Sequence, residues 1–285
     1  MASKSKSDHR GEALRRHGGL PGPGFTRVFG REPVRELLDR AAAEVTALYV
    51  AAGTEHALAR EIAAARARGI AIRVVGREEI GRLTEAGANH QGVLAELRAP
   101  AYADLEKLIE QRPDPLILVD GVTDPRNLGA ALRSAEAAGA RAVVLARDRT
   151  AELTATAVKT SAGAAFHLEI ARCGNVARTL ERLKQAGYWA AALDPAGETS
   201  LYELDTGRRL VLVVGAEGSG VRDIVKRAAD FRVRIPMCGR VGSLNVSVAL
   251  AVALFEIARG RAARAMAVGR RGNAARGATA GGSAK

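Results

Sequence analysis

The second half of the chain repeats one pattern, in which a short apolar run is followed by a polar loop and a helical segment. The runs are PLILVD, RAVVLA, HLEIA, YWAAALD, RLVLVVG and FRVRIP. Continuous apolar runs indicate strands buried on both faces, and strands that alternate with helices form a mostly parallel sheet. We therefore expect an α/β domain, in which ligands bind in loops at the carboxyl ends of strands.

The same pattern divides the chain into segments. Residues 26–99 predict a smaller α/β module with strands TALYVAA, IAIRVV and VLAEL, and residues 114–262 predict the larger domain. Residues 100–113 provide a linker and a first helix. Residues 1–25 and 263–285 lack hydrophobic periodicity and are rich in Gly and Arg, so we expect disordered basic tails.

Charge is concentrated in the two ends. The first 31 residues carry seven basic and two acidic side chains, and residues 259–285 carry seven basic and no acidic ones, which accounts for the whole formal net charge of +12. Flexible basic ends bind polyphosphate through counterion release, which favours an RNA partner. Tails that only keep the protein soluble are the alternative.

Several classes of protein are excluded by what the sequence lacks. Cys173 and Cys238 are far apart and have no partners at metal-ligand spacing, so we expect reduced thiols, no metal and a cytoplasmic location. No apolar run is long enough to span a membrane, and no apolar stretch follows the charged N-terminus as in a secretory signal.

Three loops after strands concentrate polar residues and glycines. In the first, residues 120–133, Asn127 is placed to cap a helix, and Gly129 leaves space one turn before Arg133, which could reach a phosphate or hydroxyl. A capped helix with a solvent-facing arginine is the alternative. In the third, residues 235–247, Ser243 or Asn245 can cap the last helix, and a simple helix start is the alternative.

The second loop, VGAEGSG at residues 214–220, has three glycines that let a ligand approach the backbone. It matches neither GxxxxGK[ST] nor GxGxxG, so neither a nucleotide P-loop nor a dinucleotide site is supported. The alternative is a glycine-rich turn without a ligand, in which Glu217 is solvated.

Taken together, the three loops resemble a known family. NLGAALRSA, VVGAEGSGV and IPMCGRVGSLNVSVALAVALFE, in this order, resemble the motifs of the SpoU (TrmH-type) family of RNA 2'-O-ribose methyltransferases, within the SPOUT class. The resemblance covers residues 26–260. The first module, with GANHQGV, is similar to the small, ribosomal-protein-like RNA-binding domain of many members. The set looks closest to the bacterial branch that methylates a guanosine in the P loop of 23S rRNA, although the long basic ends are unusual.

The resemblance implies a parallel sheet with a deep trefoil knot, a homodimer with its site near the subunit interface, and S-adenosylmethionine as cofactor. It implies catalytic roles for the polar residues of the three loops, which are Asn127, Arg133, Glu217, Ser243 and Asn245. Cofactor contacts, largely through the backbone, are expected from Val214, Gly215, Gly220, Ile235, Met237, Gly239 and Leu244. RNA contacts are expected from Asn89, His90, Gln91 and Arg126.

Arg133 carries the mechanistic hypothesis. Because free arginine stays protonated well above neutral pH, it is a poor general base. We expect it instead to engage the 2'-hydroxyl and a neighbouring phosphate and to stabilise the developing alkoxide. A tRNA ribose methyltransferase, or an RNA-binding assembly factor without catalysis, are the alternatives to an rRNA methyltransferase.

Overall fold

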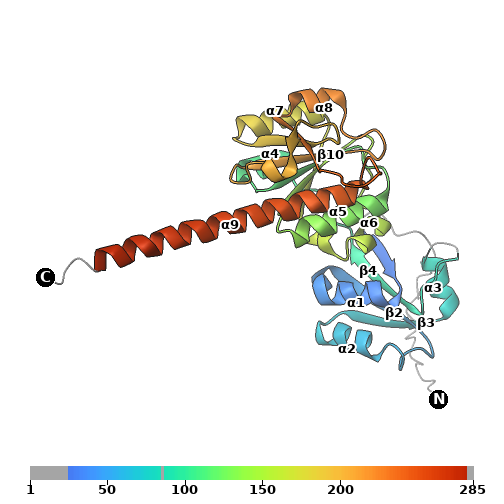
Figure 1. Ribbon diagram of the computed structural model, residues 1–285. Helices are drawn as coiled ribbons and strands as arrows, with labels where there is room; N and C mark the ends of the chain where they lie inside the picture. Colours follow the sequence, from blue (N-terminus) through green and yellow to red (C-terminus); the bar gives the residue numbers. More distant parts are fainter. Residues whose placement is uncertain (1–24, 85–86, 281–285) are drawn as a thin grey trace, which may run out of the picture.

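The computed structural model describes residues 25–84 and 87–280, which form two α/β units in contact with one another (Figure 1). The smaller, N-terminal unit has a four-stranded sheet with strand order β1-β4-β2-β3. β4 pairs antiparallel with β1 and β2, and β2 pairs parallel with β3. Its elements are β1 (Phe25–Phe29), α1 (Arg31–Arg40), a 3-10 turn (Ala42–Glu44), β2 (Val45–Ala51), α2 (Ala59–Ala67), β3 (Ala71–Val75), α3 (Arg77–Leu83) and β4 (Val93–Arg98).

The larger, C-terminal unit contains a seven-stranded sheet with strand order β7-β6-β5-β10-β8-β11-β9. Every neighbouring pair is parallel, which confirms the expected parallel α/β fold. Its strands are β5 (Leu116–Asp120), β6 (Ala142–Ala146), β7 (Glu169–Cys173), β8 (Trp189–Leu193), β9 (Thr199–Ser200), β10 (Leu210–Gly215) and β11 (Phe231–Arg234). Its helices are α4 (Leu105–Gln111), α5 (Pro125–Ala137), α6 (Ala155–Thr160), α7 (Val176–Gln185), α8 (Asp223–Ala228) and α9 (Val246–Ala280), with 3-10 turns at Ala164–Phe166 and Leu201–Glu203.

The central strands are buried on both faces, as their continuous apolar runs predict. In β10, Leu212 and Val214 belong to the apolar cluster on the side of α5 and α9. Val211 and Val213, which point the other way, belong to the cluster on the side of α4, α7 and α8. Since helices cover both faces, ligands can reach the sheet only at its ends.

The N-terminal unit packs against α6 and the 3-10 turn that follows it. Space at Gly163 is filled by Leu37 and Ala41, and Lys159 Nζ lies 4.3 Å from the centroid of the Phe29 ring. The apolar cluster around α5 continues into the N-terminal unit. α6 therefore lies between the larger sheet and the N-terminal unit (Figure 1).

The last helix differs from the prediction. We expected a basic tail without structure from residue 263, but α9 continues to Ala280 and projects away from both units (Figure 1). The physical reason lies in the composition, because alanine and arginine are both strong helix formers. The other predicted tail, residues 1–25, lies outside the described residues except for Phe25, and so does the segment 281–285.

The structure also bears on two expected absences. No helix in the described part of the chain is long and apolar enough to cross a membrane. Cys173 is buried and Cys238 is exposed, and neither forms a disulfide.

Candidate active site

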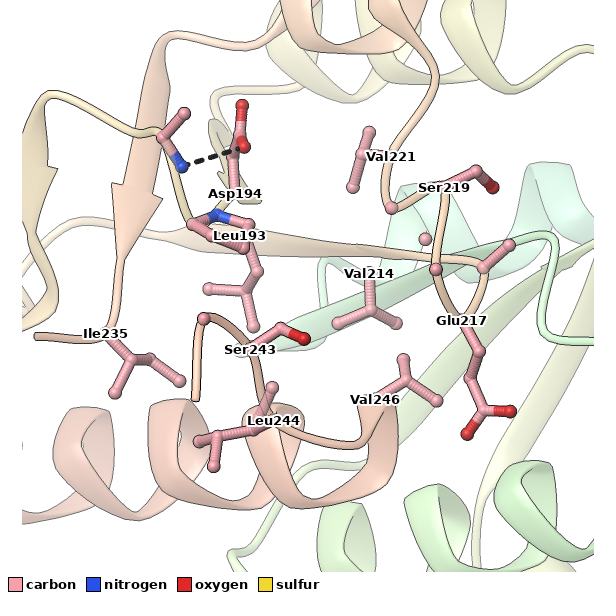
Figure 2. Close-up of a pocket in the computed structure, with 18 of the residues that line it drawn as sticks. Leu193, Asp194, Val214, Glu217, Ser219, Val221, Ile235, Ser243, Leu244 and Val246 are labelled. Atoms are coloured by element: carbon pink, nitrogen blue, oxygen red, sulfur yellow. Dashed lines mark hydrogen bonds between the residues drawn. The ribbon is translucent and has the colours of Figure 1, made fainter. Parts of the chain in front are cut away.

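A cavity of about 350 Å³ opens at the carboxyl ends of β8, β10 and β11 (Figure 2). Its walls come from residues 193–196, 214–221 and 242–244 and from Val246, with further side chains from β11 and the residues after it. Apolar side chains line the cavity, as Figure 2 shows for Leu193, Val214 and Ile235. The rule that ligands bind at the carboxyl ends of parallel strands is thus met by a real hollow.

Most of the residues expected to contact a cofactor line this cavity. These are Val214, Gly215, Gly220, Ile235, Met237 and Leu244. Ser243, expected to act in catalysis, also lines it. Gly239 does not, although it lies in the same loop, because the chain there runs along the exposed surface.

The floor of the cavity is a tight turn after β10. Ala216 and Gly220 exchange two backbone hydrogen bonds, of 3.0 and 2.9 Å. A Cβ atom at Gly215 would lie 2.0 Å from the carbonyl carbon of Gly220. Only glycine fits at position 215, which explains why the strand ends in Val-Gly before the turn.

One wall of the cavity was missed by sequence reasoning. Residues 193–196 follow β8, so the strand-end rule that selected the other loops applied to them as well. The buried carboxylate of Asp194 accepts hydrogen bonds from the Ala196 N–H and Arg232 Nε and pairs with Lys226 Nζ at 3.2 Å. Burial would raise the pKa of Asp194, but these three partners outweigh it and hold the pKa below its usual value.

The three predicted loops meet in one polar cluster. Asn127 Nδ2 donates to Glu217 Oε1 at 2.5 Å, and Asn245 Nδ2 donates to the same oxygen at 2.7 Å and to Asn127 Oδ1 at 3.1 Å. Glu217 also lines the cavity (Figure 2), so the cluster to which it belongs lies at the edge of the cavity. Two amides and a carboxylate can together hold a ligand with hydroxyl groups.

The helix caps show why these side chains converge. Asn127 does not cap α5, as we had expected, because Asp124 does so by accepting a hydrogen bond from the Arg126 N–H at 2.8 Å. Pro125 takes the first helical position, which leaves the Asn127 amide free to face Glu217. The prediction for the last helix is confirmed, since Asn245 Oδ1 accepts from the Ser247 N–H at 2.9 Å at the start of α9.

An ion pair with a buried carboxylate links the first loop to the second. Arg222 Nε donates to Asp120 Oδ2 at 2.9 Å, and its terminal nitrogen lies 2.7 Å from Asp120 Oδ1. Asp120 ends β5, and Arg222 follows the glycine turn. This bidentate pair fixes the two segments that carry Asn127 and Glu217, and the sequence offered no sign that these two residues were partners.

Arg133 does not join the cluster. It lies further along α5, and its guanidinium pairs with Glu36 Oε1 of α1 at 3.1 Å. Gly129 does not leave room for it, because α6 fills that space: a Cβ at Gly129 would lie 2.5 Å from the Ala157 carbonyl oxygen. Arg133 thus faces the N-terminal unit, and its side chain is 53% exposed.

The residues expected to bind RNA fall into two groups. Asn89, Gln91 and Arg126 are exposed, although Gln91 Oε1 already accepts a hydrogen bond from the Arg31 N–H at 2.8 Å. His90 is buried, and its Nδ1 accepts from the Gly92 N–H at 3.2 Å. Burial, with the charge of Arg77, lowers the pKa of His90. In the structure, His90 holds the loop together, and the RNA contact expected of it stays a prediction.

The chemistry of the cavity suits an organic ligand. Its walls are apolar, with polar groups from the backbone and the amide–carboxylate cluster at one edge. Among the described residues, no group of three or more His, Cys, Asp or Glu side chains could hold a metal ion. Such a mixture of apolar walls and a few fixed polar groups is typical of small-molecule sites.

Comparison with known proteins agrees with this geometry. The model of the SpoU rRNA Methylase family matches residues 114–255, and that of the RNA 2'-O ribose methyltransferase substrate binding domain matches residues 27–103. The 23S rRNA (guanosine-2'-O-)-methyltransferase RlmB of Photorhabdus laumondii is 41% identical over 239 residues, which cover 82% of this chain and 98% of that protein. The chain belongs to the SpoU rRNA methylase family. Its residues 27–103 and 114–255 are called the substrate-binding and catalytic domains below.

Further relatives support the assignment of this SpoU methylase. An uncharacterized tRNA/rRNA methyltransferase of Mycolicibacterium gilvum is 42% identical, over 82% of this chain and 76% of that protein. The SpoU methyltransferase AviRb of Streptomyces viridochromogenes, solved with AdoMet, is 26% identical with a TM-score of 0.66, over 84% of this chain and 92% of that one. An AdoMet-bound rRNA methyltransferase of Sinorhizobium meliloti is 28% identical with a TM-score of 0.65, over 82% and 87%.

Proposed function

We propose that this protein transfers a methyl group from S-adenosylmethionine to the ribose 2'-hydroxyl of a guanosine in the P loop of 23S rRNA, in the cytoplasm. The observation that carries the proposal is the Asn127–Glu217–Asn245 cluster at the edge of an apolar cavity. It joins a place for a cofactor to a place for a ribose. The relatives named as 23S rRNA (guanosine-2'-O-)-methyltransferases supply the choice of RNA and of nucleotide.

The cavity fits S-adenosylmethionine. Its volume of about 350 Å³ lies in the range of small-molecule sites. Val214, Ile235 and Leu244 offer apolar surface for the adenine ring, and the backbone around Gly215 and Gly220 is free of side chains that would keep a ligand away. When bound, S-adenosylmethionine supplies an electrophilic methyl group on its sulfonium.

The residues of the chain hold the other reactant. The amides of Asn127 and Asn245 and the Glu217 carboxylate orient the ribose, and Ser243 shapes the cofactor side of the cavity. Fixing both reactants in line contributes up to ~7–11 kcal/mol in favourable cases. The 2'-hydroxyl loses its proton as it attacks, so a cation near the oxygen lowers the barrier. Arg133 is the residue we assign to that task.

The position of Arg133 links the proposed catalytic mechanism to the oligomeric state of the protein. In the single chain, Arg133 is paired with Glu36 and does not reach the cluster. We therefore propose a homodimer, in which a second copy lies near the site. Exposed apolar side chains on α9, namely Val248 and Phe255, support that surface. The deep trefoil knot is part of the same proposal and would involve the loops after β8, β10 and β11 that wall the cavity.

The test is methyl transfer from labelled S-adenosylmethionine to total RNA that lacks ribose methylation, followed by mass-spectrometric mapping. A single 2'-O-methylguanosine in 23S rRNA is the expected product. A product in tRNA would retain the chemistry and overturn the substrate. Tight cofactor binding without transfer to naked RNA calls for the same assay on ribosome assembly intermediates. Absence of both binding and transfer would favour the non-catalytic alternative.

A further inference from the structure

The segment that connects β6 to α6 leads from the carboxyl end of β6 to the helix that packs against the substrate-binding domain. This segment, residues 147–154, is called the β6–α6 loop here. β6 pairs with β5 in the sheet, so the loop begins at the same sheet edge as the candidate site, two strands or about 10 Å from β10. At its other end α6 packs against the substrate-binding domain through Lys159 and Phe29. The loop is therefore a candidate contact for an RNA that binds to both the domain and the site.

Hydrogen bonds hold the loop against the first site loop. The Gly121 N–H donates to Thr150 Oγ1 at 3.1 Å, and the Ala151 N–H donates to the Val122 carbonyl at 2.8 Å. Gly121 and Val122 lead directly into the cap of α5 that positions Asn127. The β6–α6 loop is therefore fixed relative to the amide–carboxylate cluster.

The other side of the loop is fixed to β7. The Arg147 N–H donates to the Cys173 carbonyl at 2.8 Å, and Arg172 donates to the Arg147 carbonyl at 2.8 Å. Arg172 also pairs with Glu152 at 3.0 Å, within the same loop. Because hydrogen bonds and an ion pair hold the loop on both sides, its surface is formed before any RNA binds.

Two arginines on this surface have no carboxylate partner within the described residues. Arg147 and Arg149 are exposed, and neither makes an ion pair, whereas the nearby Arg172 and Arg222 are both paired. Asp148, which lies between them, is exposed and makes no ion pair with another described residue. Arg149 has a φ of +64°, a conformation that a side chain other than glycine adopts at some cost. The fold thus holds an unpaired guanidinium outward, beside the site.

We propose that the β6–α6 loop binds the phosphodiester backbone of the substrate RNA through Arg147 and Arg149. The proposal rests on the RNA methyltransferase function given above and extends its RNA surface from the substrate-binding domain to the reacting ribose. Guanidinium groups match phosphate oxygens in geometry and charge. Contacts of this kind set the register of a nucleic acid without reading its sequence.

The test compares two double variants that remove the same charges from opposite edges of the sheet. Arg147→Gln/Arg149→Asn changes the loop, and asparagine is chosen because it tolerates positive φ. The control, Arg112→Asn/Arg141→Gln, lies at the amino ends of β5 and β6. Both control arginines are exposed and unpaired in the described residues, and Arg112 has a φ of +53°. A third variant, Arg147→Lys/Arg149→Lys, keeps the charge.

RNA binding is measured directly, as the affinity for a 23S rRNA transcript over a range of KCl concentrations. The loop variant should lower the slope of log affinity against log salt by roughly 1.4–1.8 and weaken binding about tenfold at low salt. The control variant and the lysine variant should keep the wild-type slope. In the methylation assay the loop variant should raise the KM for RNA and leave kcat and S-adenosylmethionine affinity unchanged.

Equal salt slopes for the loop variant and the wild type would overturn the proposal. An equal loss of RNA affinity in the loop variant and the control variant would also overturn it. Failure of the proposed function has a different signature, because no protein in the set, wild type included, would then transfer a methyl group. The salt slopes still decide the role of the two arginines in that case.

Discussion

The cofactor side and the RNA side of this active site differ in how completely one chain builds them. The cofactor side is formed by the backbone turn after β10, and the half-buried Asp120–Arg222 pair links the residues that follow this turn to the end of β5. On the RNA side, Arg133 makes one exposed ion pair with Glu36. A single chain therefore preforms the cavity, while Arg133 reaches a productive position only when something displaces Glu36.

The strength of the two kinds of contact supports this distinction. Exposed ion pairs contribute about 0–1 kcal/mol, so a phosphate or a second subunit can replace Glu36 at little cost. The bidentate Asp120–Arg222 pair cannot be exchanged in that way, because removing Arg222 would leave the buried Asp120 carboxylate without its counter-charge. Binding of the cofactor should thus depend on residues that cannot move, and catalysis on one that can.

The largest expected effect tests the cofactor side. In Gly215→Ala the new Cβ would meet the backbone of Gly220 at 2.0 Å, so the turn must open and S-adenosylmethionine binding should be lost. Gly239→Ala is the control, since nothing lies within 4 Å of its added Cβ and the residue does not line the cavity. Calorimetric titration with S-adenosylmethionine checks both. Wild-type affinity in Gly215→Ala would show that the turn is not the floor of the cofactor site.

The next largest effect tests the RNA side. Arg133→Ala should lower kcat about 10²–10³-fold, the range seen when one group that stabilises an oxyanion is removed. Cofactor affinity and melting temperature should stay close to the wild type, because the arginine is half exposed and lies outside the cavity. Glu36→Gln removes the same ion pair from its other end and should leave kcat equal or higher.

Those two variants separate catalysis from packing. A matching loss of kcat in Glu36→Gln and Arg133→Ala would mean that the ion pair itself matters, as a link between the domains. Near-normal turnover in Arg133→Ala would remove Arg133 from the mechanism.

The sequence predicted the cofactor side better than the RNA side, for a physical reason. Strand ends, glycines and caps are local features, so the loops around Gly215 and Asn245 could be located from the chain alone. Their meeting with Asn127 followed from the parallel sheet, which brings the carboxyl ends of strands to one edge. The wall at Asp194 obeyed the same rule and could have been found with it.

The features that the sequence did not predict concern interactions between distant segments. Asn127 looked like a cap because the sequence around it offers two capping residues, and only the helix start at Pro125 decides between them. The direction of Arg133 depends on α1, and the burial of His90 depends on the packing of its domain. For α9, the glycines and positive charge after residue 262 indicated a tail, while the helix propensity of alanine and arginine decided the outcome.

A smaller effect is expected from the pair that joins the two site loops. Asp120→Asn keeps the shape and removes the charge that Arg222 neutralises, and should lower the free energy of unfolding by about 1–2 kcal/mol. The value lies below that for a fully buried pair because Arg222 is 44% exposed. Asp223→Asn, the same change at a neighbouring carboxylate that is 84% exposed, should stay within about 0.5 kcal/mol. Urea denaturation measures both, and equal losses would mean that the pair does not stabilise the site.

The smallest effect concerns the loop that carries His90 in the substrate-binding domain, and it appears in the pH dependence of stability. Burial and Arg77 lower the pKa of His90, so the folded state favours the neutral imidazole. Below the unfolded value of about 6.5 the unfolded chain takes up more protons than the folded one, and stability falls as the pH decreases from there toward the folded pKa. His90→Gln should therefore lose less stability between about pH 6.5 and 5 than the wild type.

RNA binding by the same variant decides where the RNA surface of this domain ends. At pH 8 the His90→Gln variant should bind RNA as the wild type does, because the imidazole is buried and hydrogen-bonded to Gly92. Asn89→Ala, at the exposed neighbour, should weaken binding if the loop contacts RNA. A loss of RNA affinity in His90→Gln without a change in melting temperature would show that the loop opens to RNA. The RNA-binding form of the loop would then depend on the substrate, as the productive position of Arg133 does.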